Sequence, residues 1–415
     1  MKLSKSSTYS ILIFILFYLS LFIGFLIGED TAGGAKYDYN FHLEVRDFFL
    51  SDTLNALKNF LNANAFHSPI FYIFLKYLLA FNETIGRFIF LNISILIPII
   101  FYLSLKKIVD LDKSIILLIS CFFFISPYFR STAIWPGDEN LAILFFLCSI
   151  YFYILYKNSN SEKDKNLFII GNILFVAIAS YFRPNYSLFS IFFFYELVLK
   201  KFSYKNFFIY IIVSVLLAYP AIHYVFILKI NFFYGSLQRF NLFNSFPLAY
   251  SVFIFFLVPF ILFEFKNLVK NHKINYLNLL LTILLTFIVY FFFNYDLSHG
   301  GGIIFMSQKY FFTGNIFMCL VFAISFYISN VILNIKKTSN FLLLIILILF
   351  ELDSYFYMET YDPLFLICLF LLFDTTIIKN FFKNKILFKI NILFCYLFIF
   401  YIAKIINIYV LLNKL

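Results

Sequence analysis

The chain has 415 residues, of which 63 % are hydrophobic and only 13 % are charged. An average soluble domain has about 25 % charged residues, so this composition excludes a soluble globular enzyme, a disordered chain and a coiled coil. The net charge of +11 could suggest nucleic-acid binding. The basic residues, however, are grouped in short gaps between apolar runs, which is typical of a multi-pass membrane protein.

The first apolar run extends from about Tyr9 to Ile27, after Lys2 and Lys5. It is longer than the apolar part of a signal peptide and predicts an uncleaved first transmembrane helix. Twelve more runs are candidate spans: 86–105, 115–127, 140–156, 167–180, 186–199, 207–229, 247–264, 276–293, 311–333, 341–353, 363–378 and 388–411. Several are short, which predicts tilted, broken or half-spanning helices.

The sequence therefore predicts an all-α fold, a polytopic transmembrane bundle of about 11–13 spans in a single membrane domain, 1–415. The first outer loop, 29–85, is long, and we expect amphipathic helices in it. The five cysteines all lie inside apolar runs and have neither metal-ligand nor disulfide spacing.

Placing the N-terminus in the cytoplasm sorts the charges by membrane face. The cytoplasmic segments then hold 20 of the 32 basic residues, all of them lysines: Lys2, Lys5, Lys106, Lys107, Lys113, Lys157, Lys163, Lys165, Lys200, Lys201, Lys205, Lys266, Lys270, Lys273, Lys336, Lys337, Lys379, Lys383, Lys385 and Lys389. All the arginines lie on the other face: Arg46, Arg87, Arg130, Arg183 and Arg239. This asymmetry predicts that any chemistry takes place on the periplasmic or luminal face.

The first outer loop contains Asp38 and His42, which share a face if the segment is helical. A partly desolvated acid at the membrane surface could serve as a general base. The alternative interpretation is a solvated amphipathic helix lying on the membrane.

Two later outer segments combine charged and aromatic residues. In 128–139, Trp135 could be an interface anchor or a sugar platform, and Asp138 could cap a helix that starts at Asn140. Arg183, next to Pro184-Asn185, lies between two short spans and needs an anionic partner. That partner could be a phosphate or a carboxylate such as Asp38 or Asp138.

The outer segment 294–310 contains three consecutive glycines, 300–302, preceded by His299 and followed by Gln308 and Tyr310. Glycines permit positive φ or close approach of a backbone to a ligand, or they form a flexible turn. No part of the chain fits a phosphate-binding loop, a dinucleotide fingerprint, a zinc-protease helix or a Ser-His-Asp order.

Four segments, in this order along the chain, resemble motifs of one enzyme family: Tyr37-Asp38-x-x-Phe41-His42, His67-Ser68-Pro69-x-x-Tyr72, Arg183-Pro184-Asn185, and Ser298-His299 with Gln308-x-Tyr310-Phe311. The family is the polyprenyl-phosphate-glucose-dependent alpha-1,2-glucosyltransferases of the N-glycan precursor pathway, within the GT-C superfamily of integral-membrane glycosyltransferases. Tyr39 stands where that family has a second acid, and the second proline after Pro69 is missing.

The resemblance implies a GT-C-like fold and an inverting transfer of a hexose, with Asp38 as general base. Arg183, or as second choice Arg130, would hold the lipid phosphate, and His42, His299 and Gln308 would orient sugar hydroxyls. The remaining expected substrate-binding residues are Asp138, Glu139, Asn185 and Tyr310. No metal or cofactor is implied, although a divalent ion is compatible with the chemistry.

The partners implied are a polyprenyl-phosphate sugar donor, a glycan, lipid or protein acceptor, and membrane lipid, with no nucleic acid. The expected location is the bacterial inner membrane, or the endoplasmic reticulum if the source is eukaryotic, with the site on the outer or luminal face. The competing functions are a membrane transporter or flippase, a polysaccharide polymerase or ligase for lipid-linked glycans, and a non-catalytic scaffold.

Overall fold

The computed structural model of the chain describes residues 5–63, 65, 67–227, 241–271, 276–295, 300–311, 315–352, 356–383 and 385–412. Every regular element in these ranges is a helix, which confirms the all-α prediction for the described part of the chain. The chain divides into two compact units, Met1–Phe233 with Phe394–Leu415, and Tyr234–Leu393. The expectation of a single membrane domain stays a prediction.

The first unit contains the N-terminal helices and the end of the C-terminal helix: α1 (Lys5–Ile27), α2 (Ala35–Phe48), α3 (Thr53–Lys58), η1 (Phe60–Ala63), α4 (Pro69–Leu78), α5 (Glu83–Ser94), α6 (Leu96–Ile108), α7 (Lys113–Ser120), η2 (Cys121–Ile125), α8 (Pro127–Ile134), α9 (Asp138–Asn158), α10 (Glu162–Phe182), η3 (Pro184–Leu188), α11 (Phe189–Phe194), η4 (Tyr195–Leu199), α12 (Tyr204–Ile222), η5 (His223–Ile227) and the last part of α21 (Ile386–Leu412).

The second unit contains α14 (Leu242–Asn271), α15 (Tyr276–Phe292), α16 (Gly302–Phe311), α17 (Ile316–Ile332), α18 (Thr338–Leu349), η6 (Met358–Thr360), α19 (Leu364–Leu371), α20 (Thr376–Phe381) and the beginning of α21.

Seven described helices are long and apolar enough to cross a membrane: Thr8–Ile27, Glu83–Ile108, Asp138–Asn158, Glu162–Phe182, Tyr204–Phe226, Leu242–Phe265 and Ile386–Asn407. An eighth span results if Lys113–Ile125 and Pro127–Ile134, which meet at 71°, are counted together. The expected number was 11–13, and the difference lies in short runs. The runs at 276–293, 311–333, 341–353 and 363–378 form helices of 17, 17, 12 and 8 residues.

The run at 186–199 is broken, as its length suggested. It forms a 3₁₀ turn, a six-residue α-helix and a π-helical turn. Pro184 at the start of the 3₁₀ turn has no backbone N–H, so a continuous helix from α10 would lose a hydrogen bond there.

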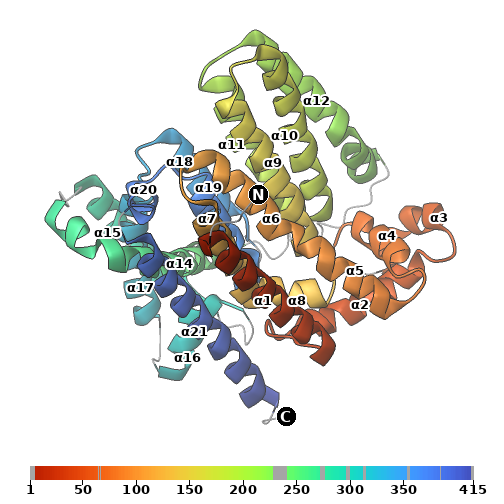
Figure 1. Cartoon of the computed structure of the whole chain (residues 1–415), viewed down its shortest axis with the longest axis horizontal. Helices are drawn as coiled ribbons and strands as arrows, with labels where there is room; N and C mark the ends of the chain where they lie inside the picture. The colour runs from red at the N-terminus through yellow and green to blue at the C-terminus, as the bar shows by residue number, and fades with distance from the viewer. Residues whose placement is uncertain are drawn as a thin grey trace. The chain divides into compact units, whose positions relative to one another are not determined.

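Helices α9 and α10 form an antiparallel hairpin that positions most of the candidate site (Figure 1). Each has 21 residues, and the rings of Phe145 and Phe182 stack between them at 5.7 Å. The turn is fixed by Ser161, whose Oγ accepts a hydrogen bond from the backbone N–H of Asp164 and so caps α10. Because the hairpin is antiparallel, the beginning of α9 and the end of α10 lie at the same end.

The opposite end of α9 carries lysines. The Nδ2 of Asn158 donates a hydrogen bond of 3.0 Å to the carbonyl of Lys107. Lys157 and Lys200 form ion pairs of 3.2 and 2.7 Å with Glu196, whose side chain is buried. The two ends of one helix are therefore chemically distinct.

Helix α2 lies in the segment 29–85, whose position as an outer loop stays a prediction, and it is amphipathic. Its buried residues, Tyr39, His42 and Val45, recur every three residues, while Tyr37 and Asp38 are exposed. Helices α2, α3 and α4 lie together on one side of the first unit (Figure 1).

The glycine run adopts the positive φ that the sequence predicted. Gly300, Gly301 and Gly302 have φ of 82°, 79° and 79°. These glycines allow another segment of the same chain to approach their backbone. The N–H of Gly301 donates a 2.7 Å hydrogen bond to the carbonyl of Phe356. A Cβ on Gly300 would lie 2.3 Å from that same carbonyl oxygen.

Candidate functional site

Asp38 lies in the first turn of α2, in a segment that the sequence left either helical or not. This turn is held by Asp30, whose carboxylate accepts hydrogen bonds from the backbone N–H groups of Ala35 and Lys36, at 3.3 and 3.1 Å. A negative charge is favourable at a helix N-terminus, because the unpaired N–H groups make it partly positive. Asp38 is exposed to solvent, so it can meet a ligand.

The surroundings of Asp38 weaken its acidity. Although Asp38 keeps exposed surface, the protein atoms around its carboxylate partly desolvate it and raise its pKa above the ordinary value, and the nearby carboxylates of Asp30 and Asp138 add to this effect. The charge of Arg183 acts in the opposite direction and lowers it. A carboxylate with a raised pKa accepts a proton more readily, which suits a general base.

His42 lies one helical turn after Asp38 but points into the protein. It is 3 % exposed, and its Nδ1 has no hydrogen-bond partner among the described residues. Burial is the main cause that lowers the pKa of His42 to about 3. His42 is therefore neutral at physiological pH.

His67 connects α2 with α9. It lies just before Ser68-Pro69, which begin α4, and Pro69 occupies a first-turn position where its missing N–H does no harm. The rings of His67 and His42 are 4.9 Å apart and nearly perpendicular. The Nδ1 of His67 lies 2.9 Å from the Oδ2 of Asp138, which forms a histidine–carboxylate pair.

Asp138 is the first residue of α9, and its side chain is 1 % exposed. The sequence suggested that Asp138 caps a helix starting at Asn140, and the structure corrects this. The helix starts at Asp138 itself, the N-cap is Gly137, and no side chain caps it. The carboxylate binds His67 and Arg183 instead.

Arg183 is the C-cap residue of α10 and reaches across the hairpin to the beginning of α9. Its Nε donates to Asp138 Oδ2 at 3.4 Å, and its Nη2 is paired with Glu139. Of the two partners that the sequence left open for Arg183, this structure contains the carboxylate. The Arg183 side chain is 16 % exposed, so the guanidinium is partly accessible. Asn185 follows in η3 and is half-buried.

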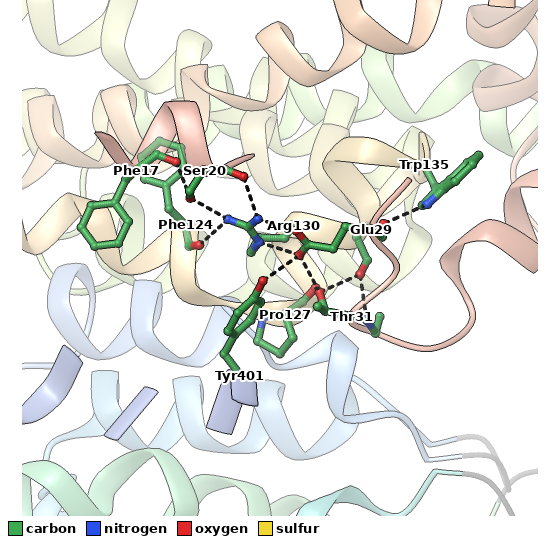
Figure 2. Close-up of polar contacts among 11 residues, drawn as sticks. Phe17, Ser20, Glu29, Thr31, Phe124, Pro127, Arg130, Trp135 and Tyr401 are labelled. Carbon is green, nitrogen blue, oxygen red and sulfur yellow. Dashed lines mark hydrogen bonds and ion pairs between the residues drawn. The ribbon is translucent and has the colours of Figure 1, made fainter. Parts of the chain in front are cut away.

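Arg130 belongs to a second polar cluster, shown in Figure 2. The guanidinium is 4 % exposed and forms a bidentate pair with Glu29, at 2.7 Å from Nε to Oε1 and 2.5 Å from Nη2 to Oε2. It also donates to Ser20 Oγ, to the Ser20 carbonyl and to the Phe124 carbonyl. The OH of Tyr401 on α21 donates to Glu29 at 3.2 Å.

The geometry gives Arg130 a structural role. All three guanidinium nitrogens donate to protein acceptors, and the cluster ties α1, α8 and α21 together (Figure 2). The expectation that Arg130 binds substrate stays a prediction, and Arg183 is the arginine that lies with the predicted general base.

Trp135, for which two surface roles were open, is buried. It is 7 % exposed, and its Nε1 donates to the carbonyl of Glu29 at 3.0 Å. The guanidinium of Arg87 stacks on the indole ring at 3.6 Å. In this structure Trp135 packs the loop after α1 against α8 and presents no ring to a ligand.

The fourth motif of the resemblance lies in the second unit. His299 lies outside the described residues. Gln308 is on α16 and is buried, and Tyr310 is on the same helix. Their participation in a site with Asp38 stays a prediction. A cavity of about 310 Å³ in this unit is lined by apolar side chains of α14, α15 and α18, and it contains none of the predicted site residues.

Among the described residues, no group of three or more His, Cys, Asp or Glu side chains is arranged to hold a metal ion. The expectation that no cofactor is needed stays a prediction.

His67 belongs to one of the four motifs but has no role predicted from the sequence, although it contacts both His42 and Asp138. Its place directly before the Ser-Pro helix start was the available signal. Glu29, the partner of Arg130, follows the first apolar run directly, and no sequence pattern pointed to its pairing with Arg130.

The candidate site therefore comprises Asp38, His42, His67, Asp138, Glu139 and Arg183, all in the first unit. Comparison with known proteins adds no identification: no protein-family model matches the chain, and neither the curated proteins nor the solved structures contain a match.

Proposed function

We propose that this protein is a GT-C-type membrane glycosyltransferase that moves a hexose from a polyprenyl-phosphate donor to a glycan, lipid or protein acceptor. One observation carries the proposal. Three of the four segments that resemble the glucosyltransferase family, at 37–42, 67–72 and 183–185, come together through Asp138 and the two histidine rings.

The proposed step is an inverting displacement at the anomeric carbon of the donor sugar. The acceptor hydroxyl oxygen forms a bond to that carbon while the carbon–oxygen bond to the phosphate breaks. The bonding electron pair leaves with the polyprenyl phosphate, and the hydroxyl proton passes to the carboxylate of Asp38. Its exposure and its raised pKa both suit this role.

Arg183 is the residue proposed to hold the donor phosphate. A guanidinium has five N–H donors, so it can contact a phosphate while it remains paired with Asp138 and Glu139. These two carboxylates fix its orientation, and a fixed donor stabilises charge that develops on the leaving phosphate. His299 is a proposed partner of a sugar hydroxyl. His42 and Gln308, which are 3 % and 7 % exposed, would join it only when substrate binding makes them accessible. The lipid tail would lie in the bilayer.

We place the reaction on the periplasmic or luminal face, because the site lies at the end of α9 that is opposite its lysines. A transporter or flippase would instead need ionisable groups along a path through the bilayer. The site described above is gathered at one end of a helix hairpin, which favours the transferase.

The test is an activity assay on the purified full-length protein in lipid nanodiscs, with a panel of labelled polyprenyl-phosphate sugars and acceptors. Asp38→Asn should lower kcat by about 10²- to 10⁴-fold, the usual contribution of a general base. Asp47→Asn is the matched control, because Asp47 is another exposed carboxylate on α2, paired with Arg46. It should leave kcat unchanged.

Arg183→Ala should abolish binding of the lipid-phosphate donor, whereas Arg46→Ala on α2 should not. If no donor in the panel is transferred by the wild type, or if Asp38→Asn turns over normally, the proposed function is wrong. Unchanged donor affinity in Arg183→Ala would leave Arg183 as a structural residue and remove the phosphate site.

A further inference from the structure

The carboxylate of Asp138 is the point at which three distant segments of the first unit meet. One of its oxygens, Oδ2, lies 2.9 Å from His67 Nδ1 and 3.4 Å from Arg183 Nε. The Asp138 side chain is 1 % exposed, so it has almost no surface to offer a ligand. Any effect of Asp138 on a ligand must therefore act through His67 and Arg183, the two residues that its carboxylate binds.

The pairing selects the tautomer of His67. An ionised carboxylate can only accept hydrogen bonds, so Nδ1 of His67 must carry a proton. In a ring that carries this proton alone, the other nitrogen, Nε2, is an acceptor. The His67 side chain is 27 % exposed, so the ring can be reached by a ligand.

The groups around His67 are consistent with an acceptor of this kind. Asp38 and His42 face it from α2, Asp138 from α9, and Arg183 from the end of α10. His42 is neutral, while Arg183 is already engaged with two carboxylates. A hydroxyl is neutral and adds no further charge to these groups, so it is a suitable ligand for Nε2 of His67.

We propose that His67 carries its single ring proton on Nδ1 and accepts a hydrogen bond at Nε2 from a hydroxyl of the sugar substrate, and that Asp138 is its positioning residue. The proposal rests on the proposed function for the identity of the ligand. It gives His67 a role in substrate recognition and replaces the direct contact with substrate that the sequence suggested for Asp138.

The tautomer is measured without substrate, by ¹⁵N NMR of the full-length protein labelled at its histidines, with His67→Gln to assign the signal. We expect an Nδ1-protonated ring in the wild type and a changed signal in Asp138→Asn. The matched control is Glu196→Gln. Glu196 is likewise 1 % exposed at its side chain and paired with two lysines, at the opposite end of the hairpin. Its loss should leave the His67 signal unchanged.

The second readout is the kinetics of sugar transfer. Losing one hydrogen bond to a hydroxyl should lower kcat/KM about tenfold in His67→Gln. Asp138→Asn should lower kcat/KM at least as much, because this substitution also removes one of the two carboxylate partners of Arg183. The double variant should be no worse than Asp138→Asn alone, since the two residues act in series. Glu196→Gln should retain the kcat/KM of the wild type per folded molecule.

Four results would overturn the proposal: an Nε2-protonated ring in the wild type, a His67 signal that does not respond to Asp138→Asn, additive losses in the double variant, or full activity in His67→Gln. A wild type that transfers no sugar would overturn the proposed function and the hydroxyl contact together. The tautomer result separates that case, because it depends only on the pairing with Asp138.

Discussion

Arg183 lies between two carboxylates, so much of its positive charge is compensated before a ligand arrives. The sequence predicted that this arginine needs an anionic partner, because an isolated charge between short helices is costly. It could not choose between a phosphate and a carboxylate. The choice depends on the contact between residues 138 and 183, which only the packing of the hairpin creates.

At the same scale, Asp38 and His42 could be predicted to share a helix, because their spacing of four matches the helical repeat. Their different exposure could not. His42 is buried because Phe71 and Tyr72 of α4 pack against its ring, at 5.1 and 5.8 Å between ring centroids. That contact joins segments about 30 residues apart.

His42 makes stability depend on pH. The pKa of His42 is about 3 in the folded protein, below the ordinary value of 6.5 that applies to the unfolded chain. Above pH 6.5 the ring is neutral in both states, so its full contribution to the free energy of unfolding is present there. This contribution is lost as the pH falls from 6.5 toward 3, by up to about 1.4 kcal/mol for each pH unit, because the unfolded chain binds a proton there.

We expect His42→Phe to reduce this loss. The measurement is the unfolding temperature of the protein in detergent between pH 8 and pH 4, compared with the wild type. Parallel curves for the two proteins would contradict the assignment.

At the scale of elements, the sequence located most of the long helices, and it missed their ends. The run at 167–180 was judged short, yet α10 has 21 residues, Glu162–Phe182. Its first turn contains Glu162 and Asp164, and because these residues are charged, a hydropathy pattern assigns them to a loop. Acidic residues are favourable in a first helical turn, so the helix extends through them.

The bend between the helices around Ser126 was not predicted, although its cause is local. Pro127 begins α8 and Ser126 caps it, since Ser126 Oγ accepts from Phe129 N at 3.1 Å. A new cap at this point ends one helix and starts another in a different direction. The bend brings Arg130 to Glu29 at the end of α1.

The Glu29–Arg130 pair should be essential for holding these elements together. Removing one partner of a buried ion pair leaves the other uncompensated, which typically costs about 3–5 kcal/mol. We therefore expect Glu29→Gln to lower the free energy of unfolding by about this amount, and the double variant Glu29→Gln with Arg130→Met to recover part of it.

The control for this prediction is Arg46→Met, which removes the more exposed pair with Asp47 and should cost less than about 1 kcal/mol. The measurement is denaturant unfolding of each variant in the same detergent. Equal effects of Glu29→Gln and Arg46→Met would contradict the role of the buried cluster.

For the whole molecule, composition was sufficient to predict a helical membrane protein, and seven or eight helices in the described part of the chain fit that prediction. The division into two units was not visible in the sequence, because apolar runs follow one another without a change of composition. The orientation in the membrane stays a prediction based on the lysines. Consistent with it, the residues assigned to different faces lie at different ends of α9.

Cysteine labelling tests this orientation. In a variant without native cysteines, Ser159→Cys in the turn between α9 and α10 should be protected from an impermeant thiol reagent in intact cells. Asp47→Cys on α2 should be labelled, because the first loop is predicted to face outward. The reverse pattern would place the site in the cytoplasm and contradict the proposed function.

The two ends of α9 have a consequence for the membrane itself. The helix is about 31 Å long, close to the hydrocarbon thickness of about 30 Å, and each end is fastened by buried charges. A helix held in this way cannot adapt to a thicker bilayer by sliding, and a thicker bilayer would draw one ionic cluster into the acyl chains. Bilayer thickness is therefore expected to act as a physical regulator of this protein, with the proposed sugar transfer fastest in membranes whose core matches α9.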